Sequence, residues 1–217
     1  MLQTPLLRQL CSLRYAREVP RAIIALGANL PGPAGSPEAT LAAAASRLAA
    51  LGSIVARSSL YSTAPVGYAD QPRFLNAVLT LETSLAPRDL LNALLAIERD
   101  LGRDRTAAFP NGPRTLDLDI LLYGDLVFSE PGLEIPHPRF AERAFVLVPL
   151  HEIAPGLRDP HTGSTVSELL QSLLSRPETD CNAAIKVQSH RWHPRALPGS
   201  GPIALSAPAA DHQFPRG

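Results

Sequence analysis

The sequence predicts an α+β fold of the ferredoxin-like, split βαβ type, in which helices pack on one face of an antiparallel sheet. Short apolar or alternating runs and two amphipathic runs follow one another in the order strand, helix, strand, strand, helix, strand. Glycines and prolines separate these runs, as expected at the ends of helices and strands. The chain has 217 residues, of which 45% are hydrophobic, and no internal repeat is evident. We therefore expect a single organised domain.

The first half of the pattern gives a strand, a helix and a second strand. Residues 22–26 form a short apolar run, which is typical of a buried strand. Residues 36–38 supply a serine cap, a proline for the first helical position and an early acid, so a helix is expected over 39–51. Gly52 ends this helix. The serine-rich alternation of 53–61 predicts one strand.

The second half repeats strand and helix after a loop. Prolines and a glycine in 62–73 predict that loop, and 74–82 reads as the next strand. A proline opens a helix over 87–101, which carries leucines at helical spacing and is followed by a glycine. A second long loop over 103–114 leads to a strand over 115–123, where apolar and polar residues alternate cleanly.

The domain boundaries follow from composition. A proline-bounded turn and an apolar segment share 133–150, a short helix is expected over 165–175, and the organised domain is expected to span 21–178. Residues 1–20 predict an extension without the features of a secretory signal, although an organelle-targeting peptide stays open. Prolines and glycines predict a mostly disordered tail over 179–217.

Three ring-bearing side chains of that tail are expected to lie outside the core. His190 and His193 fit a solvated, proline-rich tail better than they fit a metal site. Trp192 is the only tryptophan of the chain, and its place in the tail predicts that it has no core role.

Composition and charge exclude several classes of protein. Twenty basic and twenty acidic residues give a formal net charge of zero, so no nucleic acid or anionic membrane is indicated as a partner. No apolar run reaches the roughly 18–20 residues that cross a bilayer. Cys11 and Cys181 are too few and too distant for a disulfide framework or a zinc cluster. Lys186 is the only lysine and no glycine-rich loop precedes it, which excludes a P-loop NTPase and a protein kinase.

Two aspartates in the last strand of the pattern carry the chemical argument. Residues two apart in a strand point to the same side, so Asp117 and Asp119 share one side. The other side presents aliphatic residues to the helices, namely Leu116, Leu118, Ile120 and Leu122. Neighbouring carboxylates repel each other in a low dielectric unless a cation lies between them. Mg²⁺ takes such ligands together with substrate phosphates. The alternative is a solvated edge of the sheet.

Arginines beside the aspartates favour the metal site. Arg114 lies just before the pair, and Arg103 and Arg105 lie on the same loop. Guanidinium groups suit phosphate oxygens and the charge that develops during phosphoryl transfer. The combination indicates a polyphosphate substrate that is bound with Mg²⁺. A simpler alternative stays open, in which the arginines only neutralise the aspartates.

Residues 22–155 resemble one known family on several ordered motifs. These motifs are Ala25-Leu26-Gly27-Ala28-Asn29-Leu30, Asp70-Gln71-Pro72, Phe74-Leu75-Asn76, Gly112-Pro113-Arg114-Thr115-Leu116-Asp117-Leu118-Asp119, Pro136-His137, Arg143 with Phe145, and Glu152-Ile153-Ala154-Pro155. They are similar to the motifs of the 6-hydroxymethyl-7,8-dihydropterin pyrophosphokinases of folate biosynthesis. The resemblance covers most of the expected domain.

The resemblance implies a reaction and a nucleotide site. A pyrophosphoryl group would pass from ATP to the hydroxymethyl oxygen of 6-hydroxymethyl-7,8-dihydropterin, giving AMP and the pterin diphosphate. Asp117 and Asp119 would hold two Mg²⁺ ions that bridge the ATP phosphates. The residues implied at the nucleotide are Arg103, Arg105, Arg114, His137, Arg143 and Glu98, of which Arg103 and Arg114 would steady the transferring group. Positioning and charge stabilisation would then dominate catalysis.

The resemblance also implies a pterin pocket. Phe74 and Phe145 would sandwich the ring, and Asn76 would bond its polar edge. The pocket would further be lined, partly through backbone groups, by Thr63, Pro65 and Val66. From the residues alone, Asn76 is the most telling member, because a buried amide needs hydrogen-bond partners. Simpler alternatives remain for other members: the phenylalanines as core residues, His137 as a turn residue and Glu98 as an intrahelical charge.

The chain departs from the family pattern at two places. The loop 103–114 is one residue longer than is usual, and Phe109, Pro110 and Asn111 stand where a tryptophan is often found. This loop is thought to close over the substrate, so the change bears on the packing of a lid. Pro138 replaces an aromatic residue that often follows the histidine, and this bears on adenine contacts.

Two other classes of function compete with the enzyme. A ferredoxin-like RNA-recognition domain would read RNA with aromatic residues on its central strands, whereas this strand presents Asp117 and Asp119. A noncatalytic relative kept as a scaffold would have no use for the acid pair and the arginines, but the changed loop 103–114 leaves this class open. We therefore expect a monomeric, cytoplasmic enzyme whose partners are ATP and the pterin, without nucleic acid or membrane.

Overall fold

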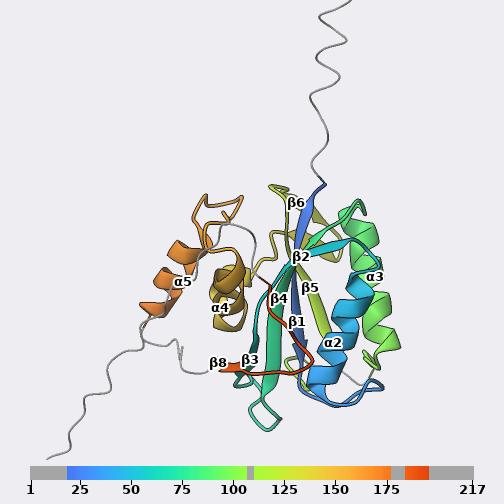
Figure 1. Cartoon of the computed structure of the whole chain (residues 1–217). Helices are drawn as coiled ribbons and strands as arrows, with labels where there is room; N and C mark the ends of the chain where they lie inside the picture. Colours follow the sequence, from blue (N-terminus) through green and yellow to red (C-terminus); the bar gives the residue numbers. More distant parts are fainter. Residues whose placement is uncertain (1–18, 107–109, 177–183, 196–217) are drawn as a thin grey trace, which may run out of the picture.

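The computed structural model describes residues 19–106, 110–176 and 184–195. Within these ranges, six strands form the main sheet: β1 (Arg21–Ala28), β2 (Ser53–Arg57), β3 (Leu60–Thr63), β4 (Phe74–Glu82), β5 (Asp117–Tyr123) and β8 (Ile185–Val187). The strands are antiparallel in the order β5-β1-β4-β3-β8, and β2 pairs with β4 beside β3 (Figure 1). Because β5 and β4 flank β1, the ferredoxin-like α+β prediction is confirmed.

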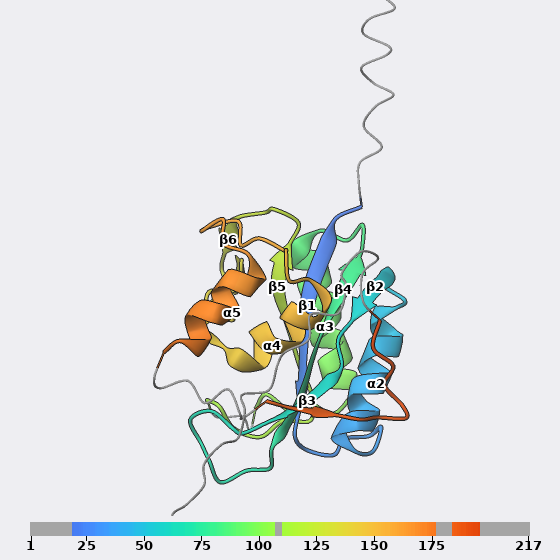
Figure 2. The ribbon, with the colours of Figure 1, turned by 60° about the vertical axis from the view of Figure 1, so that its left-hand side comes forward.

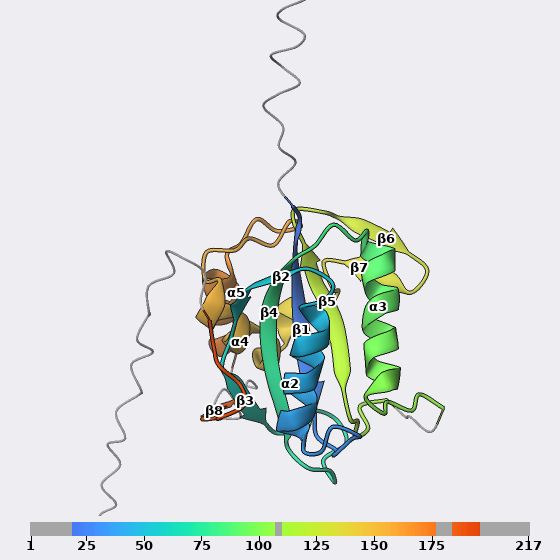
Figure 3. The same ribbon diagram turned by 45° about the vertical axis from the view of Figure 1, so that its right-hand side comes forward.

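Helices cover both faces of this sheet. The helices are α2 (Pro37–Leu48), α3 (Pro87–Asp100), α4 (Ala144–Ile153) and α5 (Val166–Leu174), with a 3₁₀ turn over Phe140–Glu142. α2 and α3 lie side by side on one face (Figure 3), and α4 and α5 lie on the other. A small hairpin joins β6 (Phe128–Glu130) to β7 (Leu133–Ile135). None of the helices described is long and apolar enough to cross a membrane.

The second helical layer corrects the expectation of helices on one face. Ile23 and Val78 point away from α2 and α3 and are covered by α4 and α5, in a cluster with Val146, Leu147 and other residues of these helices. The opposite face carries a separate cluster built from alternate strand residues and from α2 and α3. A sheet buried on both faces has nearly continuous apolar strands, as β4 does, and such strands do not reveal by periodicity which face is covered.

A β-bulge corrects the side assigned to one leucine. Leu118 and Ile120 pack toward α2 and α3 as predicted, but Leu122 lies with Leu121 in the cluster under α4 and α5. The register between β1 and β5 shifts between Ile23 and Ile24. The extra residue in β5 reverses the alternation beyond it.

The strand expected over 53–61 is two strands. Ser58 and Ser59 interrupt it, and both are buried. The Ser58 hydroxyl donates to the Ser59 carbonyl and accepts from the Val78 amide, so side-chain bonds take the place of part of the ladder. The other expected helices and strands begin and end within a few residues of their limits, so their existence and type are confirmed. β7 and most of α4 lie within 133–150, where the sequence predicts only a proline-bounded turn and an apolar segment, so these two elements were missed.

The described part of the C-terminal tail is ordered against the sheet. β8 pairs with the outer edge of β3, and the segment then runs across to the first turn of α2, where Ser189 donates to Glu38 (Figure 2). Trp192 is 2% exposed, so the expectation that it has no core role is wrong. Its indole N–H donates to the Ser58 carbonyl at 2.6 Å. Residues 1–18, 107–109, 177–183 and 196–217 lie outside the described residues, and they include both cysteines and Phe109.

Candidate active site

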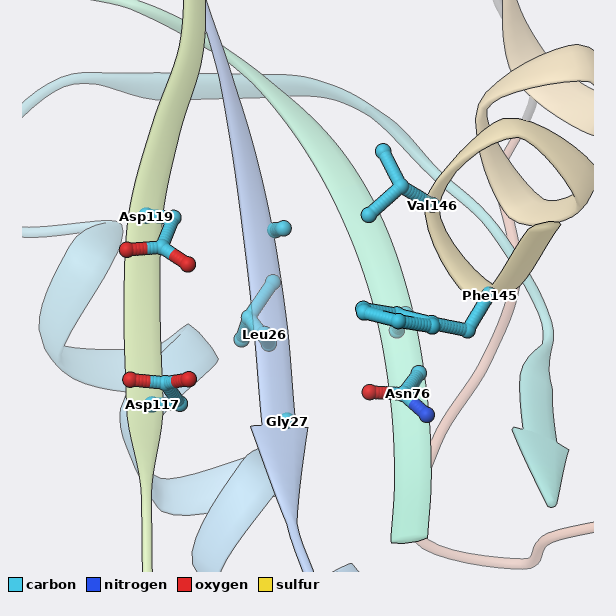
Figure 4. Close-up of a pocket in the computed structure, with 9 residues that line it drawn as sticks. Leu26, Gly27, Asn76, Asp117, Asp119, Phe145 and Val146 are labelled. Atoms are coloured by element: carbon cyan, nitrogen blue, oxygen red, sulfur yellow. The ribbon is translucent and has the colours of Figure 1, made fainter. Parts of the chain in front are cut away.

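A pocket opens between the central strands and the first turn of α4 (Figure 4). Its lining consists of Ala25, Leu26, Gly27, Asn76, Ala77, Asp117, Asp119, Phe145 and Val146. The carboxylates of Asp117 and Asp119 project from the same side of β5, as the strand periodicity predicts. Phe145 and Asn76 face them from the other wall of the pocket. Residues implied separately for metal and for pterin therefore share one cavity.

Asp117 is neutralised by arginines from the preceding loop. One carboxylate oxygen accepts from Arg103, and the other accepts from Arg114 Nη1 at 2.8 Å. Arg103 also donates to the Leu116 carbonyl at 2.6 Å, which ties the loop to the start of β5. In this arrangement the arginines balance the charge of Asp117, as either role expected for them requires.

Asp119 is left without such compensation. Among the described residues, none forms a hydrogen bond or an ion pair with its carboxylate. Burial, followed by repulsion from Asp117, raises the pKa of Asp119 to about 6, although Arg143 and Arg103 oppose the shift. A carboxyl group that is costly to ionise here becomes a good ligand once a cation lies beside it.

The acid pair fits a divalent ion that is shared with a substrate. No cluster of three or more metal-ligating side chains occurs in the described ranges. Asp117 and Asp119 are the two carboxylates that project into the pocket. Mg²⁺ is commonly held in this way, by one or two carboxylates, with phosphate oxygens and water completing its shell.

Glu98 organises the arginine loop from the end of α3. Its side chain is 1% exposed and accepts from Arg105 Nη2 at 2.5 Å, from Arg103 Nη1 at 3.3 Å and from the Leu118 amide at 2.8 Å. Burial raises the pKa of Glu98, while the hydrogen bond from Arg105 acts in the opposite direction. Since its partners lie on the loop and on β5, the alternative of a simple intrahelical charge is wrong.

His137 and Arg143 lie near the carboxylates on the chain that leads into α4. The His137 amide donates to the Leu121 carbonyl at 2.8 Å, and its Nδ1 accepts from the Arg139 amide at 3.1 Å. Burial, followed by the charge of Arg143, lowers the pKa of His137. The lowered pKa favours the neutral imidazole, and the hydrogen bond that Nδ1 accepts leaves Nε2 as the position for its proton.

The residues implied for the pterin are brought together only in part. Asn76 is buried and donates to the Thr63 hydroxyl at 2.7 Å, beside Phe145 in the pocket. Phe74 is not part of the lining, and the Arg114 guanidinium lies 5.3 Å from the centre of its ring. The loop residues Pro65 and Val66 are not part of the lining either, and Val66 is 59% exposed.

Asn29 belongs to one of the motifs that carry the resemblance, but the sequence alone predicts no role for it. It is 4% exposed, and its oxygen accepts from the Arg114 amide at 2.8 Å. Its amide nitrogen donates to Gln71 Oε1 at 2.9 Å and to the Pro72 carbonyl at 3.0 Å. Asn29 thus joins the loop before Phe74 to the arginine loop. Its position at the end of an apolar strand is the signal that could have identified it, as it did for Asn76.

Carboxylates placed for a divalent ion beside arginines placed for phosphate are the arrangement that phosphoryl transfer requires. The fold and this set of side chains are therefore compatible with an α+β phosphotransferase.

Comparisons with known proteins define the family. The model of 7,8-dihydro-6-hydroxymethylpterin-pyrophosphokinase (HPPK) matches residues 23–155. The 2-amino-4-hydroxy-6-hydroxymethyldihydropteridine pyrophosphokinase of Pseudomonas aeruginosa is 49% identical over 152 residues, which is 70% of this chain and 91% of that one. The protein of the same name from Methylorubrum extorquens is 46% identical over 155 residues, 70% and 93% of the two chains. The chain belongs to the HPPK family of pyrophosphokinases, enzymes of folate biosynthesis.

Solved structures support the fold. The HPPK-DHPS of Plasmodium falciparum, a triple mutant with STZ-DHP, aligns with a TM-score of 0.60 at 16% identity. The alignment covers 77% of this chain and 46% of that longer chain, so the present chain matches about half of its length.

Proposed function

We propose that the chain transfers a pyrophosphoryl group from ATP to the hydroxymethyl oxygen of 6-hydroxymethyl-7,8-dihydropterin, releasing AMP. The observation that carries this assignment is the common pocket, in which Asp117 and Asp119 face Phe145 and Asn76. A nucleotide's phosphates held at the acids and a flat heterocycle held at the aromatic wall would bring the two reacting groups together. Such positioning supplies much of the acceleration in phosphoryl transfer.

The nucleotide side is proposed to work by exchange of ionic partners. Asp117 and Asp119 would hold two Mg²⁺ ions, which supply charge neutralisation of the phosphates when bound. Arg103 and Arg114 would then leave Asp117 for phosphate oxygens, because the metal takes their place on the carboxylate. The other groups proposed to contact the nucleotide, directly or through these arginines, are Arg105, Glu98, His137 and Arg143.

The pterin side is proposed to form when Arg114 moves. Its guanidinium now lies over Phe74, and its departure would free that ring to stack on the pterin opposite Phe145. Asn76, oriented by Thr63, would bond the polar edge of the ring. Pro65 and Val66 would reach the pterin through backbone groups of their loop. The same arginine movement would thus prepare both substrate sites.

Identification of the product nucleotide tests the reaction. Purified protein with ATP, Mg²⁺ and the reduced pterin should form AMP in step with pterin diphosphate, and omission of the pterin should stop AMP formation. The Asp117→Ala variant should lose the activity and stay folded. ADP as the product would indicate a simple kinase and contradict the proposal.

We also propose that the enzyme is a monomer and works in the cytoplasm. The lining already contains the acid pair, the aromatic ring and the amide on which the proposed reaction depends. Size-exclusion chromatography with light scattering and cell fractionation test these two statements.

A further inference from the structure

Glu152, in the last turn of α4, joins three other segments of the chain. Its carboxylate accepts from the Ser59 amide at 2.7 Å, the Ser59 hydroxyl at 2.8 Å, the Tyr61 hydroxyl at 3.2 Å and the Lys186 ammonium at 2.8 Å. These donors lie at the junction of β2 and β3, on β3 and on β8. The cluster is separate from the phosphate-side arginines and has no part in the proposed transfer.

The elements that Glu152 joins also form the pterin side of the pocket. The first turn of α4 carries Phe145 and Val146, about 10 Å along the helix from Glu152 at roughly 1.5 Å per residue. Tyr61 is the register partner of Asn76 in the pairing of β3 with β4. The tie from α4 to β3 therefore joins the helix that carries the aromatic wall to the strand that pairs beside the amide.

Lys186 stands at the outer end of this cluster. Its backbone is fixed by pairing with Tyr61, and Trp192 anchors the same segment in the core. Its side chain is 60% exposed, yet it is the cation paired with Glu152 among the described residues. Without Lys186, the half-buried Glu152 carboxylate would have only the neutral donors of Ser59 and Tyr61 as partners. The attachment of α4 to β3 would then be weaker.

The charges of the cluster are arranged to be stable at neutral pH. Burial opposes ionisation of Glu152, but hydrogen bonds from Lys186 and Ser59 lower its pKa overall. Burial, followed by the charge of Glu152, raises the pKa of Tyr61, so the phenol keeps the proton that it donates.

We infer that Glu152, held in place by Lys186 of the C-terminal segment, is a positioning residue that sets the pterin-binding wall of α4 against β3 and β4. The inference rests on the proposed pterin pocket. It assigns to the C-terminal segment a part in substrate binding, although that segment does not line the pocket.

Steady-state kinetics of four variants test the inference. Lys186→Ala should raise the KM for the pterin about three- to tenfold, with the KM for ATP and kcat within about twofold of wild type. Glu152→Gln should raise the pterin KM further, and Lys186→Arg should restore it. Arg47→Ala is the matched control, because it removes an exposed ion pair of 2.7 Å with Asp100 between α2 and α3, away from the pocket.

The outcomes separate this inference from the function on which it rests. Wild-type pterin KM in both Lys186→Ala and Glu152→Gln, or equal losses for both substrates, would overturn it. Phe145→Ala in the same assay tests the pocket itself: if the pterin KM stays normal there, the proposed pocket fails. A raised KM in Phe145→Ala alone leaves the pocket standing and rejects the role of Glu152. If Glu152→Gln does not fold, the exposed Lys186 variants still decide.

Discussion

Asp117 and Asp119 have the same chemistry but opposite electrostatic situations. Asp117 forms ion pairs with Arg103 and Arg114, whereas Asp119 is partly buried and has no such partner among the described residues. An ionised Asp119 therefore opposes folding unless a cation is bound, whereas the Asp117 carboxylate is held by two ion pairs. A site that lowers its own stability is common where a ligand supplies the missing charge.

This difference predicts a pH-dependent gain in stability for Asp119→Asn. Because the pKa of Asp119 rises from 3.8 to about 6 on folding, the folded state binds a proton that the unfolded chain has already lost. Stability from that proton is present at low pH and is lost as the pH rises through about 6. In EDTA, Asp119→Asn should be more stable than wild type, and the difference in the free energy of unfolding should grow between pH 4 and 6 and level off above pH 6 at about 3 kcal/mol. Thermal melts over this pH range should show a corresponding rise in the Tm of the variant relative to wild type.

The matched variant Asp117→Asn should behave in the opposite way. It leaves Arg103 and Arg114 without their carboxylate, so it should lower the Tm at pH 7. A Tm difference between Asp119→Asn and wild type that does not change with pH would contradict the charge assignment.

Glycine at position 27 is required by the space in the pocket, and not by a positive backbone φ. A Cβ at this position would lie 3.0 Å from Asn76 Oδ1 and 3.8 Å from Asp117 Cβ. Gly27→Ala should therefore push the Asn76 amide away from its bond with Thr63 and raise the pterin KM about tenfold, with the ATP KM little changed. Gly156→Ala, where a Cβ meets open space, is the control. Equal kinetics of the two variants would exclude a role for Gly27 in shaping the pocket.

The placement of the acid pair could be predicted from the sequence, but its partners could not. A period of two is a local property of the strand, so the common side of Asp117 and Asp119 followed directly. The division of arginines between them depends on how the loop 103–114 folds back on Glu98, which is a tertiary matter. The same holds for Asn29, whose three hydrogen bonds reach residues 42 to 85 positions away.

At the level of elements, the sequence does not predict the places where a strand departs from regular pairing. The bulge in β5 puts Leu121 and Leu122 into one cluster, and the buried serines at 58–59 divide one expected strand into β2 and β3. Neither irregularity changes hydrophobicity in a way that a periodicity argument detects. The break at the serines is what allows Ser59 to present two donors to Glu152 from α4.

The junction of α3 with β5 gives a prediction at this scale. Glu98 lies in the last turn of α3, forms ion pairs with Arg103 and Arg105, and accepts a hydrogen bond from the Leu118 amide. Glu98→Ala therefore leaves the arginine loop and β5 without the side chain that joins them. The variant should lose roughly 3 kcal/mol of stability and raise the ATP KM more than the pterin KM. Asp100→Asn, two residues later in the same helix, removes an exposed pair and should lose less than about 1 kcal/mol. Similar losses of stability in Glu98→Ala and Asp100→Asn would show that Glu98 does not hold the loop and β5 together.

For the whole molecule, the largest departure from expectation is the C-terminal segment. Its prolines and glycines resemble a disordered tail, and three residues of strand are too short for a pattern. One long-range contact decides the outcome, because Trp192 enters the core beneath Arg57, whose guanidinium lies 4.7 Å from the indole centre. Composition describes the average behaviour of a segment and is silent about a single anchoring side chain.

Trp192 gives the last prediction, since the only tryptophan of the chain is a direct optical probe of this anchor. A buried indole should emit at a shorter wavelength in the native protein than in urea, and acrylamide should quench it poorly. Trp192→Ala should lose about 3–5 kcal/mol of stability, which corresponds to a fall in Tm of roughly 6–20 °C. Trp192→Phe should lose less, because it retains packing and leaves only the Ser58 carbonyl without its donor. Because β8 continues from this anchor to Lys186, both variants should also raise the pterin KM, in the order of their stability losses. Native emission like that of free tryptophan would place the segment in solvent and remove the support on which Lys186 depends.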